Sequence, residues 1–174
     1  MKNSIYIFIV FIGFLVSCQK PNPNTTQAGR DQLKSLEVSE DIDKNDIAYE
    51  SVFYVPIYSD IYLDAQNQNN LLSATLSIRN TSFNDSLYIS VIDYYNTTGE
   101  KVRSYIDNTI NIPPMATLNY VIEKDDDTGG PGANFIIKMN GRNPDLKPII
   151  QAIMIGNQGN KSLAFSTDAY LISE

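Results

Sequence analysis

The sequence predicts an all-β domain built as a two-sheet antiparallel sandwich of about eight strands. After residue 46, runs of β-branched and aromatic residues alternate with polar ones at a period of two. Turn-forming Gly, Pro, Asn and Asp residues separate these runs, and no segment carries a persuasive helical period. A hydrophobic content of 43% with 10% aromatic residues is sufficient to fill a sandwich core.

The first four strands are expected between residues 52 and 107. Val52–Tyr58 contains Pro56, which favours an edge position because proline donates no backbone hydrogen bond. Residues 72–79 are apolar at even positions and polar at odd ones, which is typical of a half-buried strand. Leu87–Asn96 is apolar on both faces and is therefore expected at the centre of a sheet. The turn at 96–99 then leads into Lys101–Asp107 as a hairpin.

The remaining four strands are expected after Pro113 and Pro114, a pair that excludes a central strand. Residues 117–124 resume the alternation, with Leu118, Tyr120 and Ile122 pointing inward. Further strands are expected over 134–139, 149–155 and 162–172.

The N-terminal region has the features of an exported lipoprotein. Lys2 precedes an apolar run, Ile5–Leu15, that is shorter than the roughly 20 residues needed to span a bilayer. The sequence Leu15-Val16-Ser17-Cys18 resembles the lipobox of bacterial lipoproteins, which implies cleavage before Cys18 and acylation of its thiol. Membrane lipid, held through acylated Cys18, is thus an expected partner.

This reading divides the chain into three parts: a lipoprotein signal peptide over 1–17, a lipid anchor and flexible tether over 18–46, and the β-sandwich domain over 47–174. The tether is polar and lacks aromatic residues, and Leu33, Leu36 and Val38 are compatible only with a transient helical turn. Because Gln19 rather than Asp follows the cysteine, the rule for lipoprotein sorting favours an outer-membrane location, facing the periplasm, in a cell that has an outer membrane.

Composition argues against several functions. The formal net charge of −7 repels polyphosphate, so we expect no nucleic-acid partner. The absence of His removes Ser-His-Asp triads and His-ligated zinc, and Cys18 is the single cysteine. We therefore expect no cofactor and no enzymatic activity.

The densest acidic segment is the run Asp125, Asp126 and Asp127, followed by Thr128 and two glycines. Carboxylate oxygens suit Ca²⁺, but the twelfth position from Asp125 is Ile136 where an EF-hand loop places Glu. The three aspartates are thus weak candidates for a metal site, and a solvated turn with glycines at positive φ is the alternative.

Tyrosines and two arginines supply a candidate binding face. Exposed Tyr offers rigid amphipathic area for protein or glycan contact, and Arg recognises carboxylates. Tyr94 and Tyr95 point to opposite faces of one strand, so one of the two is expected in the core. The arginines have surface ion pairs with Asp93 or Asp107 as an alternative role. The candidate face consists of Tyr54, Tyr58, Tyr94, Arg79 and Arg103.

Four motifs carry a resemblance to a known family. They are Tyr54-Val55-Pro56-Ile57-Tyr58-Ser59, Leu76-Ser77-Ile78-Arg79-Asn80-Thr81-Ser82, Asp93-Tyr94-Tyr95, and Gly129-Gly130-Pro131-Gly132-Ala133-Asn134-Phe135. With these motifs the domain resembles an uncharacterised family of bacterial exported proteins, a domain of unknown function. A wider resemblance, to immunoglobulin- and fibronectin-type bacterial modules, implies a binding, spacing or presenting role.

Three functional hypotheses follow. The first is a membrane-anchored, non-catalytic binding or structural module of the cell envelope, whose partner is an envelope protein or glycan. The second is a Ca²⁺- or glycan-binding module that uses the acidic run and the Tyr face. The third is a His-independent hydrolase acting on envelope polymers, because a fold class does not exclude activity.

Overall fold

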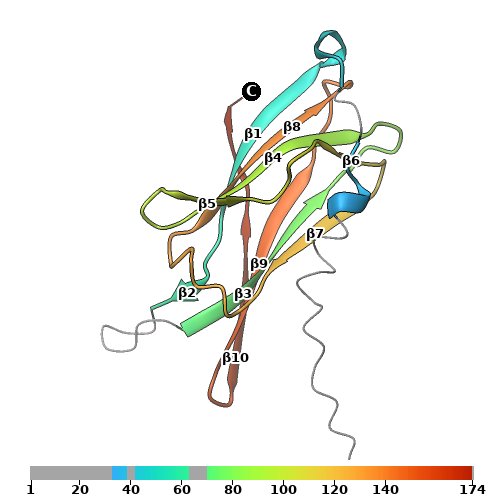
Figure 1. The fold of residues 1–174 in the computed structure, drawn as a ribbon. Helices are drawn as coiled ribbons and strands as arrows, with labels where there is room; N and C mark the ends of the chain where they lie inside the picture. Colours follow the sequence, from blue (N-terminus) through green and yellow to red (C-terminus); the bar gives the residue numbers. More distant parts are fainter. Residues whose placement is uncertain (1–32, 39–41, 63–69, 174) are drawn as a thin grey trace, which may run out of the picture.

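The computed structural model describes residues 33–38, 42–62 and 70–173. These residues contain a helical turn at 33–35, one short 3-10 helix, Lys44–Asp46, and eleven strands (Figure 1). The strands are β1 (Tyr49–Pro56), β2 (Asp60–Ile61), β3 (Asn70–Arg79), β4 (Leu87–Tyr95), β5 (Lys101–Ser104), β6 (Ile110–Ile112), β7 (Thr117–Ile122), β8 (Asn134–Gly141), β9 (Ile149–Gln158), β10 (Lys161–Asp168) and β11 (Tyr170–Ser173).

The strands form two antiparallel sheets that lie one over the other (Figure 1). The first sheet has the order β11-β1-β8-β4-β5, with β6 also paired to β4. The second has the order β10-β9-β3-β2, with β7 also paired to β3. The prediction of an all-β, two-sheet antiparallel sandwich is confirmed.

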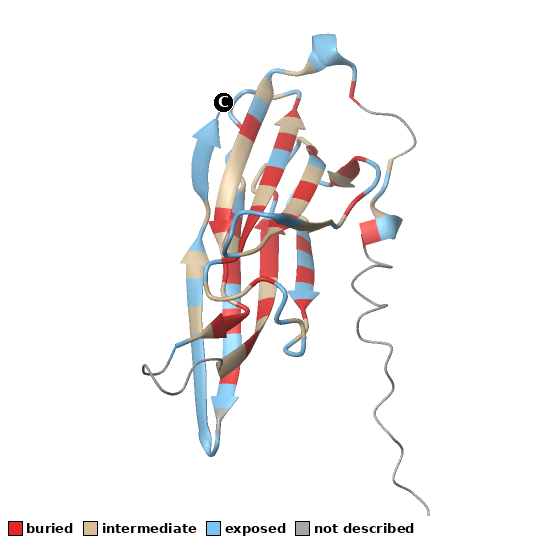
Figure 2. Ribbon diagram, turned by 60° about the vertical axis from the view of Figure 1, so that its left-hand side comes forward, coloured by how far each residue is buried: buried red, intermediate tan, exposed pale blue. Residues whose placement is uncertain are grey.

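The core lies between the two sheets and is filled by alternate residues of their inner faces. Buried and accessible residues alternate along β7, where Leu118, Tyr120 and Ile122 are buried as expected (Figure 2). The even-numbered residues of β3 from Leu72 to Ile78 are likewise buried. Period-two patterning therefore located the core of both strands, because successive side chains of a strand point to opposite faces.

The strand count differs from the eight expected, for two reasons. Strands β2 and β6 are too short to show a periodic pattern. The run 162–172 is not one strand, because the chain crosses between sheets at Ala169, whose N–H donates to Ile150 O (3.1 Å). Residues before this crossover pair with β9 in the second sheet, and those after it pair with β1 in the first.

The position of β1 corrects a further expectation, since this strand lies between β11 and β8 and not at an edge. Pro56 is tolerated because it ends β1, beyond Tyr54, the last residue that β11 pairs with. The central position expected for Leu87–Asn96 is confirmed, because β4 has β8 on one side and β5 and β6 on the other.

The described part of the expected tether packs against the sandwich. Leu33 is 3% exposed and belongs to the core, and Leu36 packs beside it. Val38 N donates to Thr109 O and Asn111 N donates to Leu36 O, both at 2.9 Å. The prediction of a flexible tether is therefore wrong for residues 33–38. Their apolar side chains, which are isolated within a polar stretch of sequence, cover the core beside β6. Residues 18–32 and 39–41 lie outside the described residues.

Candidate functional site

The loop between β7 and β8, residues 123–133, carries both the acidic run and the glycines. Thr97 holds it from one side: its N and Oγ1 donate to Gly129 O (2.9 and 3.0 Å), and Gly132 N donates to Thr97 Oγ1 (2.9 Å). Ser59 holds it from another, because both its N and its Oγ donate to Gly130 O at 3.2 Å. The loop is thus fixed to the end of β4 and to the segment before β2.

Two glycines allow this close contact. A β-carbon at Gly129 would overlap the hydroxyl of Tyr94, and one at Gly130 would lie 2.6 Å from Thr97 Oγ1. Gly130 also has a φ of +74°, which L-residues with side chains rarely adopt. Of the glycines expected at positive φ in this turn, Gly130 adopts it, whereas Gly129 instead permits the close approach to Tyr94.

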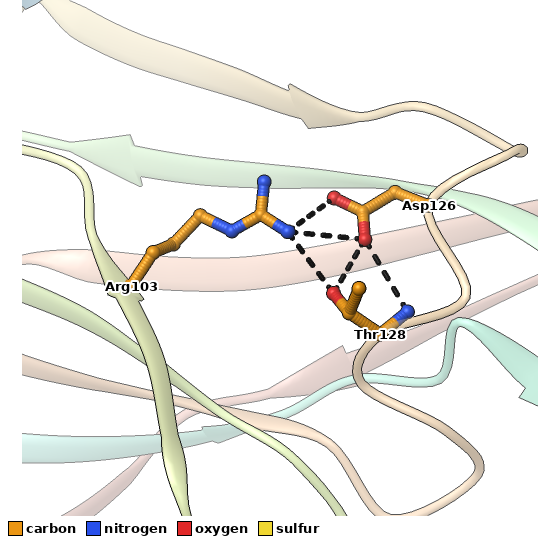
Figure 3. Close-up of polar contacts among 3 residues, drawn as sticks. All are labelled: Arg103, Asp126 and Thr128. Atoms are coloured by element: carbon orange, nitrogen blue, oxygen red, sulfur yellow. Dashed lines mark hydrogen bonds and ion pairs between the residues drawn. The ribbon is translucent and has the colours of Figure 1, made fainter.

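Arg103 on β5 joins the loop through its guanidinium group (Figure 3). Its Nη2 lies 2.8 Å from Asp126 Oδ2 and donates to Asp126 Oδ1 (3.1 Å) and Thr128 Oγ1 (3.0 Å). Thr128 N also donates to Asp126 Oδ1 at 3.3 Å. The guanidinium carbon lies 5.8 Å from the ring centroid of Tyr94 and 5.9 Å from that of Tyr105, within cation–π range.

The three aspartates of the acidic run do not act as one cluster. Asp126 is half-buried and paired with Arg103, whereas Asp125 and Asp127 are exposed. Among the residues that the structure describes, no three acidic side chains gather closely enough to enclose a metal ion. The three aspartates are therefore adjacent in the backbone, but their carboxylates do not form one metal-binding group.

A fourth aspartate, Asp60 on β2, comes close to this loop. Its side chain is only 6% exposed, and its Oδ1 has no hydrogen-bond partner within the described chain. Burial raises the pKa of Asp60, and the negative charge of Asp127 raises it further. Sequence reasoning missed Asp60, because nothing in its local sequence indicates that β2 meets a loop so far along the chain.

Tyr94 adds a second buried polar atom at the same place. The residue is fully buried, and its hydroxyl has no hydrogen-bond partner in the part of the chain described. Burial raises the pKa of Tyr94, while the nearby Ser59 hydroxyl acts in the opposite sense. Asp60 Oδ1 is thus a buried oxygen without a hydrogen-bond partner among the described residues, and the hydroxyls of Tyr94 and Ser59 interact under the loop.

The candidate binding face is not a single surface. Tyr54 lies on the outer side of the first sheet, Tyr94 lies in the core, and Arg79 is exposed on the second sheet. Of the Tyr94–Tyr95 pair, Tyr94 is the core member, and its ring packs against Phe135 in a tilted arrangement with 5.4 Å between ring centroids. The prediction that these residues form one binding face is therefore wrong. Alternation along a strand predicts which residues share a face, but it does not predict which face points inward or which sheet the strand joins.

Tyr58 and Arg79 of that set have structural contacts. Tyr58, just beyond β1, packs edge-on against Phe165 at 5.6 Å between ring centroids. Arg79 donates to Gln151 Oε1 (3.2 Å), and Gln151 Nε2 donates in turn to Asp168 Oδ1 (2.9 Å). Neither arginine pairs with Asp93, which is bound by Lys101 at 3.2 Å.

The outer side of the second sheet carries an apolar surface, which we call the isoleucine face: Ile149, Ile153, Ile155 and Val121. Their exposed fractions are 47%, 36%, 50% and 42%. The register places Thr75 between Ile153 and Val121, and Ser73 beside Ile155. Sequence reasoning missed this face. Its signal was that the strand over 149–155 carries apolar side chains on both of its faces.

A polar row crosses the isoleucine face: Arg79 lies opposite Ile149 in the register, and Gln151, bonded to Arg79 and Asp168, lies between Ile149 and Ile153. The uncharged part of the face is therefore the region around Ile153, Ile155 and Val121. The positions of β3, β7 and β9 that point outward are hydroxyl, amide or aliphatic residues as far as the hydrogen-bonded row formed by Arg79, Gln151 and Asp168. The chain has a net charge of −7, so an uncharged region on its surface stands out, and exposed apolar patches commonly mark interaction sites.

A pocket of about 420 Å³ lies between residues 33–37 and the end of β5. Tyr105 and Tyr120 contribute to its lining, and their rings pack at 4.3 Å between centroids. Glu37 and Asp107 bring two carboxyl groups to the same pocket, and Glu37 Oε2 accepts from Asn108 Nδ2 at 3.2 Å. If the protein is a hydrolase that acts through two carboxylates, this pocket is where that prediction places the site.

The fold and the loop contacts define a β-sandwich domain whose matching family is one of unknown function. The chain belongs to the family described as "Protein of unknown function (DUF3124)", whose model matches residues 50–172. The expected family of unknown function is thereby confirmed. A search of curated proteins finds no match. Among solved structures, the crystal structure of Thermotoga maritima 1070 is similar, with 15% identity and a TM-score of 0.42, covering 70% of this chain and 93% of that one.

Proposed function

We propose that the protein is a non-catalytic binding module that docks another protein of the cell envelope on its isoleucine face. The observation that carries this proposal is the exposure of four aliphatic side chains, each at least 36% accessible, on the outer side of one sheet. Leaving such side chains in water forfeits roughly 25 cal/mol for each Å² that burial would remove from solvent. A partner that covers the face recovers this free energy.

The chemistry of the face favours a protein over other envelope molecules. An apolar centre bordered by polar and charged groups, here Arg79 and Asp168, matches the anatomy of protein–protein interfaces. Glycans are recognised largely through aromatic platforms, and the outward positions of β3, β7 and β9 hold no aromatic residue. The glycan hypothesis would instead rest on Tyr54 and its cross-strand neighbour Tyr170, on the first sheet.

We further propose that acylated Cys18 holds the domain at the membrane, in the outer membrane and facing the periplasm. The lipobox around Cys18 and the residue Gln19 after it support this location. Cys18 and the leader lie outside the described residues. No helix that the structure describes is long and apolar enough to cross a membrane.

The proposal is tested by crosslinking in intact cells followed by capture of the tagged protein. Three forms are compared: the natural chain, Ile153→Asp on the isoleucine face, and Lys138→Asp on the opposite outer face. We expect a partner that is captured with the natural chain and with Lys138→Asp but is lost with Ile153→Asp. The purified partner is expected to bind the purified natural chain.

The anchor is tested separately with Cys18→Ala, which removes the acylated thiol. We expect this variant to leave the membrane fraction and to recover less partner from cells, yet to bind the purified partner as the natural chain does. Equal capture by Ile153→Asp and the natural chain would sink the docking proposal. Retention of Cys18→Ala in the membrane fraction would sink the anchor.

A further inference from the structure

We propose that β10 is a self-association edge, at which β10 of a second copy of this chain pairs with it antiparallel about a two-fold axis through Ala164. Among the described residues, β10 is the last strand of the second sheet and has β9 on one side only. The inference is independent of docking on the isoleucine face, because it concerns the edge of the sheet and not its outer side.

The register shows which backbone groups of β10 point to the open edge. Residues of β10 pair with those of β9 from Lys161↔Gln158 to Asp168↔Gln151. One step further in the same register, Ala169 N donates to Ile150 O (3.1 Å). Because hydrogen-bonded and non-bonded pairs alternate along antiparallel strands, the odd-numbered residues bond to β9. The N–H and C=O groups of the even-numbered residues therefore face the open edge: Ser162, Ala164, Ser166 and Asp168.

The edge formed by β10 lacks the features that usually prevent strand pairing. Natural edge strands are commonly short, bulged or charged. At the edges of the first sheet, β11 and β5 have four residues each and pair with a register shift, and β2 at the other end of the second sheet has two residues. In contrast, β10 has eight residues, pairs without a register shift and contains no Pro. Its residues are largely exposed (Figure 2).

The sequence of β10 is self-complementary around Ala164. Residues 162–166 read hydroxyl, apolar, Ala, apolar, hydroxyl in both directions. A two-fold axis through Ala164 places Ser162 opposite Ser166 of the second copy, and Leu163 opposite its Phe165. Leu163, which is 37% exposed, thereby gains an apolar cross-strand neighbour. A symmetric dimer requires a patch that fits itself, so this pattern favours a second copy as the occupant.

The charges of β10 favour the same arrangement. Its two charged residues, Lys161 and Asp168, stand at opposite ends. Antiparallel pairing brings opposite charges together at each end of the strand pair, whereas parallel pairing would bring like charges together. The strand is neutral overall in a chain of net charge −7, so two copies meet here with less repulsion than an acidic surface would impose.

Pairing at this edge joins the second sheets of the two copies into one continuous sheet. Because the two-fold axis is perpendicular to the sheet, the outer sides of both copies face the same way. Ala164 lies opposite Ile155 in the register, so only the two β10 strands separate the two isoleucine faces.

Cysteine crosslinking in intact cells tests the register. The double variant Ser162→Cys with Ser166→Cys places a thiol opposite a thiol of the second copy at both positions, within the reach of a disulfide. We expect a covalent dimer from the double variant under mild oxidant. Ser162→Cys alone is expected to give none, because its two copies lie roughly 13 Å apart along the strands at about 3.4 Å per residue. The natural chain, with Cys18 as its single cysteine, reports any background.

The oligomeric state of the full chain gives a second readout, measured by sedimentation in density-matched detergent. Ala164→Pro removes an N–H that faces the open edge and leaves the bonds from odd-numbered residues to β9 in place. Ser166→Lys adds a charge to the edge at an exposed position. We expect the natural chain to form dimers and both variants to dissociate with at least about a tenfold higher Kd.

Ser90→Lys is the matched control, because Ser90 is exposed on β4 in the other sheet. It is expected to form dimers as the natural chain does, and the melting temperature of Ser166→Lys shows that this variant folds. Three results would overturn the proposal: a natural chain that stays monomeric, dimers that Ser166→Lys leaves intact, or a double cysteine variant that crosslinks only to a different protein.

Discussion

Gly129 lies directly against the hydroxyl of Tyr94, so closely that a β-carbon at Gly129 would overlap the phenol oxygen. Tyr94 is fully buried on β4, and its ring packs against Phe135 in a tilted arrangement within the core. The loop that carries the acidic run is therefore seated on a core residue. Its position is set by the absence of a side chain at residue 129.

This contact predicts that Gly129→Ala destabilises the domain by about 1–3 kcal/mol, the usual cost of overpacking. Gly99→Ala is a useful comparison, because nothing lies within 4 Å of its added β-carbon and only its φ of +81° opposes the change. Urea unfolding of both variants measures the difference. Gly129→Ala combined with Tyr94→Phe is expected to recover only part of the loss, since the overlapping oxygen is gone while Tyr94 Cζ (2.6 Å) and Ala133 Cβ (2.7 Å) still crowd the added β-carbon. A Gly129→Ala variant as stable as the natural chain would contradict the contact.

The packing of the N-terminal segment predicts a stability effect far outside the strands. Leu33→Ala is expected to lower the free energy of unfolding by about 2–3 kcal/mol, because Leu33 is 3% exposed within the core. Lys34→Ala, at an exposed neighbouring position, is expected to change it by less than about 0.5 kcal/mol. Chemical denaturation measures both. Equal, small effects would show that residues 33–38 are detached in solution.

The Arg103 clamp predicts a local effect that a global melt understates. Arg103→Ala is expected to cost only about 1 kcal/mol, because the ion pair with Asp126 is partly exposed. Amide exchange at Asp126 and Thr128 is expected to accelerate, since the bonds that order this turn depend on the Asp126 carboxylate. Unchanged exchange rates in Arg103→Ala would mean that Thr97 and Ser59 hold the loop without it.

Asp60 predicts a pH dependence whose sign follows from its burial. Its pKa in the folded chain is raised above the value of about 3.9 for an unfolded chain. The folded state then holds the proton more tightly, so the stability from Asp60 is full below that value and is lost as pH rises through the folded pKa. In EDTA, Asp60→Asn should match the natural chain at pH 3 and exceed its melting temperature increasingly toward pH 7. A difference independent of pH would contradict this.

Local pattern carried much of the fold. In β3 and β7, alternation alone located the buried face, because a single period of two is enough when one side faces water. It did not reveal the crossover at Ala169, since residues 162–172 read as one continuous strand. Nor did it place Leu33, because an apolar residue in a polar stretch gains its partners only through tertiary contact.

The candidate site was less accessible to sequence reasoning. The acidic run and its glycines were recognised, but their contacts come from residues distant in sequence: Arg103 for Asp126, and Ser59 and Thr97 for the glycine backbone. The exposed isoleucines resemble core residues when only their composition is considered. Which side of β9 faces water depends on its pairing with β3 and β10, which no local pattern specifies.

The central claim, docking of an envelope protein on the isoleucine face, is tested most directly by site-specific photocrosslinking in intact cells. A photoreactive amino acid is placed at position 153 on this face, or at position 138 on the opposite outer face. We predict one discrete adduct from position 153 that disappears when Ile155→Asp is added, and none from position 138. An adduct from position 138 alone, or one from position 153 that Ile155→Asp leaves intact, would contradict the claim, and an adduct with a second copy of this chain would replace the envelope partner by self-association.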